Sequence, residues 1–121
     1  MTEQPAVIAC IDAHPKTISL LRAAANKARE LGTDWAAIYV ETPDHHLLSR
    51  DARERILRFA STTEQMGGKF LKLEGKDPVS SISLFVHQSM HSSSPVQYAF
   101  IGQTSREGFW NELKRTTAEK I

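Results

Sequence analysis

Two runs stand out from an otherwise mixed sequence: 6–11, which is apolar throughout, and 96–101, which is apolar except at Gln97. A segment that is apolar at every position suits a strand buried on both faces, as in a parallel sheet. Two further strands are predicted at 35–40 and 69–73, and the second of these alternates polar with apolar residues. Because alternation is typical of a half-exposed strand, we expect 69–73 to lie nearer an edge of the sheet.

Between the strands, apolar side chains recur every three or four positions, which is the period of an amphipathic helix. This spacing predicts helices at about 16–31, 51–66, 79–90 and 109–120. Ser49 or Arg50 is expected near the cap of the second helix, and Asp77 at the cap of the third. The predicted inner faces consist of Ile18, Leu21, Ala25 and Ala28; Ala52, Ile56, Phe59, Thr63 and Met66; Val79, Ile82, Val86 and Met90; and Trp110, Leu113 and Thr117.

The order of these elements is strand then helix, repeated along the chain with short connections. Consecutive parallel strands need a crossover, and each crossover predicted here is a helix. We therefore predict that residues 1–121 form one α/β domain with an open, parallel, doubly wound sheet. Such sheets bind ligands outside the carboxyl ends of their strands, where the strand order reverses.

The composition of the chain gives little support for nucleic acid or membrane as a partner. The chain has 15 Lys and Arg, 14 Asp and Glu and a net charge of +1, which gives no electrostatic reason to expect nucleic acid or an anionic membrane. Residues 1–5 lack the features of a signal peptide. The longest apolar run, about six residues, is far short of the roughly 20 that span a bilayer. We therefore expect a cytoplasmic domain that neither binds nucleic acid nor inserts into the membrane.

The passage from the first predicted helix into the second predicted strand is the most distinctive part of the chain. It reads LRAAA at 21–25, ARELG at 28–32 and WAAIYVETP at 35–43. In these segments the chain resembles the universal stress protein domain of KdpD-type osmosensitive potassium-channel sensor histidine kinases. The likeness extends over nearly the whole chain, with further similar positions at Arg53, 56–58, 64–68, 100–102, Ser105, Arg106 and Trp110.

This resemblance implies a regulatory domain that is not itself catalytic. It implies control of a kinase in potassium and osmotic-stress signalling, through a small ligand or through contacts with neighbouring kinase domains of the same parent chain. That parent would be an inner-membrane protein with this domain in its cytoplasmic portion. The family would enter a fifth, edge strand where this sequence stops, so we expect either a domain of a longer kinase or one that lends or borrows that strand.

The alternative is a stand-alone universal stress protein that binds ATP or another adenine nucleotide, as a homodimer. Nucleotide-binding members resemble one another in a Gly-x-x-Gly, nine residues, Gly-Ser/Thr motif after the fourth strand. Here Gly102 fills the first position and Thr116 the last, but Ser105 and Arg115 stand where the other two glycines belong. Side chains at those two places crowd a phosphate that backbone N–H groups would otherwise approach.

Other positions of the family's nucleotide site are kept. Asp12 matches an aspartate that contacts adenine or ribose, and Val40 matches a position that offers backbone contacts. Arg106, with Lys114 and Arg115, offers charge in place of glycine. The candidate site is therefore either a nucleotide site or a remnant pocket that takes a different ligand, and the missing glycines argue against a nucleotide hydrolase. Its candidate residues are Asp12, Val40, Gly102, Ser105, Arg106 and Thr116.

Histidines suggest chemistry at three places, and each has a plainer interpretation. His87 and His91 have the i, i+4 spacing of a metal pair, but no third ligand accompanies them, so no metal site is predicted. His14 is a candidate to line the pocket or to form an acid–base pair with Asp12. Because no nucleophile or oxyanion arrangement accompanies that pair, no catalytic residue is predicted. The adjacent His45 and His46 are expected to point apart in a polar connection.

Three smaller predictions remain. Cys10 is the single cysteine, which excludes an internal disulfide, and it is expected to be a buried small hydrophobe. Ser89 and residues 92–94 either cradle an anion or form a turn, and the turn is favoured. A mixed-charge, solvated helix face is predicted for Arg50, Asp51, Arg53, Glu54, Arg55 and Arg58.

Overall fold

The computed structural model describes residues 5–90 and 95–101. Its elements are β1 (Val7–Ile11), α1 (Thr17–Leu31), β2 (Trp35–Glu41), the 3-10 helix η1 (Pro43–Leu47), α2 (Arg50–Gln65), β3 (Lys69–Glu74), α3 (Pro78–Ser89) and β4 (Tyr98–Ile101). The predicted α/β arrangement is confirmed. The predicted helix at 109–120 lies outside the described residues.

The four strands of the described part form one parallel sheet in the order β3-β2-β1-β4. β1 is therefore flanked by β2 and by β4, and the strand order reverses at β1. β2 and β3 are added in turn on one side of β1, and β4 pairs with the other side of β1. Among the described strands, β3 has a neighbour on one side only, which confirms the edge position predicted from its alternating sequence.

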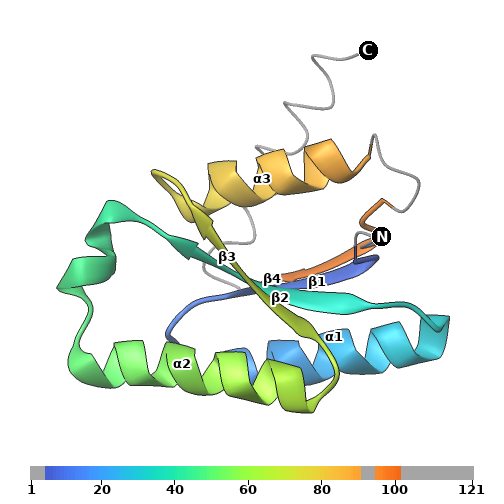
Figure 1. Ribbon diagram of the computed structural model, residues 1–121, viewed down its shortest axis with the longest axis horizontal. Coiled ribbons are helices and arrows are strands. Elements are labelled where there is room, and N and C mark those ends of the chain that lie inside the picture. The colour runs from blue at the N-terminus through green and yellow to red at the C-terminus, as the bar shows by residue number, and fades with distance from the viewer. Residues whose placement is uncertain (1–4, 91–94, 102–121) are drawn as a thin grey trace.

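Helices cover both faces of this sheet. Figure 1 shows α1 and α2 on one face and α3 on the other. Side chains of β1 alternate between two separate cores: Val7, Ala9 and Ile11 pack with α1 and α2, whereas Ile8 and Cys10 pack with α3. All five are buried, which explains why the first strand is apolar at every position.

The predicted inner faces of the first three helices are largely confirmed. Met90 is the exception: it is 57% exposed, because Ser89 takes the inward position at the end of α3. The Ser89 hydroxyl donates to the carbonyl of Val86 (2.6 Å) and accepts from the N–H of Val96 (3.1 Å). The buried members of these faces are Leu21, Ala25, Ala28, Ile56, Phe59, Thr63, Ile82 and Val86, with Ile18, Ala52, Met66 and Val79 partly buried.

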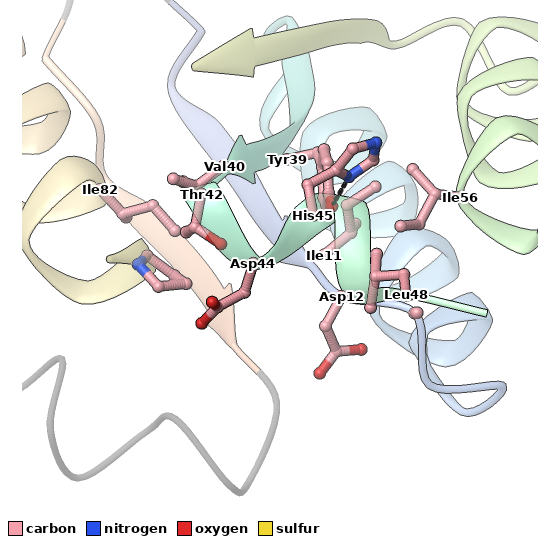
Figure 2. Close-up of a pocket in the computed structure, with 12 residues that line it drawn as sticks. Ile11, Asp12, Tyr39, Val40, Thr42, Asp44, His45, Leu48, Ile56 and Ile82 are labelled. Atoms are coloured by element: carbon pink, nitrogen blue, oxygen red, sulfur yellow. Dashed lines mark hydrogen bonds between the residues drawn. The ribbon is translucent and has the colours of Figure 1, made fainter. Parts of the chain in front are cut away.

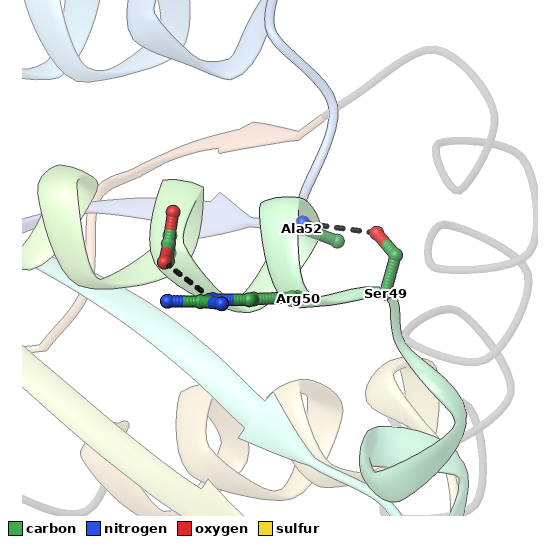
Figure 3. Close-up of polar contacts among 4 residues, drawn as sticks. Ser49, Arg50 and Ala52 are labelled. Carbon is green, nitrogen blue, oxygen red and sulfur yellow. Dashed lines mark hydrogen bonds and ion pairs between the residues drawn. The ribbon is translucent and has the colours of Figure 1, made fainter.

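Side-chain caps start the two helices that follow the connections near the carboxyl edge of the sheet. Ser49 Oγ accepts a hydrogen bond from the N–H of Ala52 (3.1 Å), as Figure 3 shows, and Asp77 Oδ1 accepts one from the N–H of Ser80 (2.8 Å). Asp77 is thus the predicted cap, and Ser49 rather than Arg50 caps α2. Each cap satisfies an N–H that the helix itself leaves without a partner.

None of the helices within the described residues has the length and apolarity that crossing a bilayer requires.

Candidate ligand-binding site

A hollow of about 180 Å³ opens at the carboxyl ends of β1 and β2, next to the strand where the sheet order reverses. This is the edge at which the fold predicts a ligand. Figure 2 shows the strand ends, η1 and α3 arranged around it. Its lining consists of Ile11, Asp12, Ala13, Tyr39, Val40, Thr42, Asp44, His45, Leu48, Ile56, Pro78 and Ile82.

The lining combines an apolar floor with a few polar groups. Ile11, Val40 and Ile82 come from the two cores and form much of the apolar surface. Asp12 and Asp44 place carboxylates on the open side of the hollow in Figure 2. An apolar cavity with a small number of polar groups is typical of small-molecule sites, although those usually measure about 300–1,000 Å³. The described walls therefore fit a small ligand or one part of a larger one.

Asp12 is held in place by the turn that follows β1. Its Oδ1 accepts hydrogen bonds from Thr17 Oγ1 (2.5 Å) and from the backbone N–H of His14 (3.0 Å). Thr17 is 3% exposed, so this carboxylate is oriented by a buried hydroxyl at the start of α1. Among the described residues, Oδ2 accepts no hydrogen bond. One oxygen of Asp12 is thus structural, and the other can accept a hydrogen bond from a ligand.

The His14 ring does not take the role that its sequence position suggested. Its Nδ1 accepts a hydrogen bond from the N–H of Lys16 (3.1 Å), and its contact with Asp12 is made by its backbone. The ring is exposed and is not among the groups that line the hollow. The structure therefore gives no ring–carboxylate hydrogen bond for an acid–base pair at this turn.

The solvated helix face predicted from the arginines is wrong for Arg55. Its Nη1 donates to the carbonyl oxygen of Ala13 (2.7 Å), and the side chain is half-buried. Arg55 directly precedes the buried Ile56, so it lies at the border of the inner face and reaches the connection after β1. Arg53 and Arg58 are exposed, as predicted, and exposed Arg50 pairs with Glu54 (3.1 Å; Figure 3).

Tyr39 and His45 form the closest polar contact between η1 and the sheet. The Tyr39 hydroxyl and His45 Nδ1 are 2.6 Å apart, and the two rings meet edge-on with centroids 5.6 Å apart. Burial, and secondarily the charge of Glu41, raise the pKa of Tyr39. The phenol therefore keeps its proton at neutral pH, and the tautomer of His45 decides which of the two groups donates in this hydrogen bond.

Asp12 and Val40 are the candidate site residues that the structure brings together at this hollow. Gly102, Ser105, Arg106 and Thr116 lie outside the described residues, so their part in the site stays a prediction. Sequence reasoning missed Thr42, Asp44, His45 and Leu48, which all come from the connection after β2. The polar character of that connection, directly after an apolar strand, was the one signal that pointed to it.

The remaining candidates do not form a second polar site in the described part of the chain. No three His, Cys, Asp or Glu side chains among the described residues gather as metal ligands, and His91 and residues 92–94 lie outside them. Ser89 serves the end of α3 rather than an anion. Cys10 is buried, as predicted, and burial raises its pKa to about 12, so it remains a protonated thiol.

Comparison with known proteins agrees with this architecture. No protein-family model matches the sequence. The sensor protein KdpD of Escherichia coli (strain K12) is 28% identical over 116 residues, which is 96% of this chain but only 12% of that protein.

Two solved structures share the fold. A universal stress protein from Archaeoglobus fulgidus superposes with a TM-score of 0.57 at 18% identity, covering 84% of this chain and 77% of that one. A protein of the universal stress protein family from Burkholderia pseudomallei gives 0.59 at 17% identity, covering 93% and 89%. The chain therefore has the universal stress protein fold, and its sequence resembles a segment of the sensor protein KdpD.

Proposed function

We propose that this chain is a ligand-sensing regulatory domain of a KdpD-like sensor histidine kinase that acts in potassium and osmotic-stress signalling. The observation that carries the proposal is the similarity to KdpD along almost the entire chain. The chain corresponds to a small fraction of that sensor's length. We therefore assign it control of the kinase, through its ligand and its contacts with neighbouring domains, and not phosphoryl transfer.

The hollow at the carboxyl edge supports binding rather than catalysis. Among the described residues, its lining contains no serine, cysteine or lysine. One oxygen of the Asp12 carboxylate already accepts hydrogen bonds from the Thr17 hydroxyl and the backbone N–H of His14. A group held in this way orients a ligand by accepting hydrogen bonds, which is the role that we propose for it.

A chimera tests the regulatory role. This chain would replace the matching segment of the Escherichia coli sensor, and autophosphorylation would be measured in membrane vesicles at low and high potassium. We expect the chimera to keep the potassium dependence of the parent, and Asp12→Asn in the chimera to reduce it severalfold. Asp34→Asn is the matched control, because Asp34 is exposed and precedes the opposite end of β2. A chimera that is phosphorylated equally at both potassium concentrations would contradict the proposal.

A second candidate is a stand-alone universal stress protein that binds ATP or another adenine nucleotide. The specific observation in its favour is that Asp12 and Val40, the two family positions within the described residues, line the same hollow. The loss of two motif glycines, at Ser105 and Arg115, weighs against tight phosphate binding.

Calorimetric titration of the purified chain with ATP tests this second function. If the hollow takes the nucleotide, Asp12→Ala should weaken binding about tenfold or more, since a hydrogen bond to a charged group contributes about 1.5–3 kcal/mol. Asp34→Ala serves as the control and should bind like the wild type. The absence of heat at millimolar ATP would exclude the nucleotide function while leaving the chimera experiment to decide the regulatory one.

A further inference from the structure

The connection between β2 and α2 forms a separate wall of the hollow. We call residues 42–48 the strap; they contain η1 and contribute Thr42, Asp44, His45 and Leu48 to the lining. In Figure 2 the strap crosses in front of the ends of β1 and β2. A ligand in the hollow would therefore touch this segment as well as the sheet.

Among the described residues, few interactions tie the strap to the rest of the domain. No residue of η1 is buried, and Leu47 is 82% exposed. Its backbone hydrogen bonds are internal: the N–H of His45 donates to Thr42 (2.9 Å) and the N–H of Leu48 to His45 (3.2 Å). These bonds give the strap its shape but do not attach it to the sheet.

Within the part of the chain that the structure describes, two contacts make that attachment. At the end of the strap nearer α2, Leu48 packs against the core formed by β1, β2, α1 and α2. In its middle, the attachment is the 2.6 Å hydrogen bond between Tyr39 and His45. Tyr39 is 8% exposed and fixed in β2, whereas His45 is half-buried, so the rigid partner is the tyrosine.

We propose that the Tyr39–His45 hydrogen bond is a latch that holds the strap as a wall of the ligand site, which makes His45 a positioning residue for ligand binding. Its effect on a ligand rests on the proposed function, because it requires that the hollow binds one. Without the bond, the strap would remain tied to the other described residues only at its ends. Binding would then have to order that wall, at a cost to affinity.

Hydrogen exchange tests the latch without any ligand. The reporters are the amides of His45 and Leu48, whose hydrogen bonds define the strap, measured by NMR against the amides of β2. Tyr39→Phe keeps the ring and removes only the hydroxyl. We expect exchange of both reporters to rise about fivefold, the ratio expected for one side-chain hydrogen bond, with β2 unchanged.

Two further variants separate the latch from a general loss of stability. His46→Gln is the matched control, because His46 is the exposed neighbour of His45 and should leave exchange unchanged. His45→Phe should behave like Tyr39→Phe, and the double variant should exchange no faster than either single one, since both remove the same bond. Wild-type exchange rates at the two reporters in Tyr39→Phe would overturn the latch.

Titration with ATP tests whether the latch affects ligand binding. If the wild type binds ATP, the Kd of Tyr39→Phe should rise about fivefold while that of His46→Gln stays the same. An unchanged Kd in Tyr39→Phe would overturn the positioning role. If the wild type binds no ATP, the nucleotide function fails, and the exchange measurement still decides whether the latch exists.

Discussion

Two buried serines on α3 show how much a single hydroxyl depends on its partners. Ser83 and Ser89 are 3% and 2% exposed. Ser89 Oγ donates to the carbonyl of Val86 within α3 and accepts from the N–H of Val96, and this second bond joins the end of α3 to the chain entering β4. Ser83 Oγ has no hydrogen-bond partner among the described residues. A buried hydroxyl without a partner costs free energy, whereas a satisfied one contributes to stability.

This contrast predicts opposite effects for the same substitution. Ser83→Ala should raise the free energy of unfolding by about 1 kcal/mol, because it removes a buried polar group that gains nothing in return. Ser89→Ala should lower it by about 1–2 kcal/mol, because it leaves the N–H of Val96 without its acceptor. Urea denaturation of both variants would measure the difference. A destabilised Ser83→Ala protein would mean that this hydroxyl has a partner after all.

Among the helices and strands, the sequence predicts best where the apolar period is strong. β1, α1, β2, α2, β3 and α3 all begin and end close to the predicted positions, because their buried stripes repeat over several turns or strand residues. The structure differs at η1, where a polar connection was expected. A 3-10 helix this short carries no apolar period of its own, and Pro43 fits its first turn as well as it fits a loop.

Some residues of the candidate site could be predicted from the sequence and others could not. Asp12 and Val40 could be predicted because they stand at the ends of apolar strands, where the fold places ligands. The roles of His45 and Arg55 could not, because each depends on a partner that folding brings near: the hydroxyl of Tyr39 and the carbonyl of Ala13. No spacing in the sequence specifies such contacts.

At the scale of the whole molecule, Cys10 links global stability to pH. Its thiol lies in the middle of the sheet, and burial raises its pKa from 9.0 to about 12. The folded protein therefore keeps this proton at pH values where the unfolded chain has lost it. The contribution of the protonated thiol to the free energy of unfolding is fully present below pH 9. It falls by about 1.4 kcal/mol per pH unit between pH 9 and 12.

Cys10→Ala tests this dependence. Between pH 8 and pH 10 the wild type should lose about 1.4 kcal/mol more free energy of unfolding than the variant, since both share every other titrating group. Guanidinium denaturation at the two pH values would measure both losses. Equal losses in the two proteins would show that the thiol does not titrate on unfolding as its burial requires.

The alternation of side chains along β1 also means that the two cores depend on the register of this strand. Val7, Ala9 and Ile11 belong to one core and Ile8 and Cys10 to the other, and Asp12 directly follows the strand. A shift of one residue would exchange the two cores. It would also displace the Asp12 carboxylate from its hydrogen bond with Thr17. Burial of the correct side chains in β1 therefore also fixes the position of Asp12 at the candidate site, and a one-residue insertion or deletion in this strand would disrupt the cores and the candidate site together.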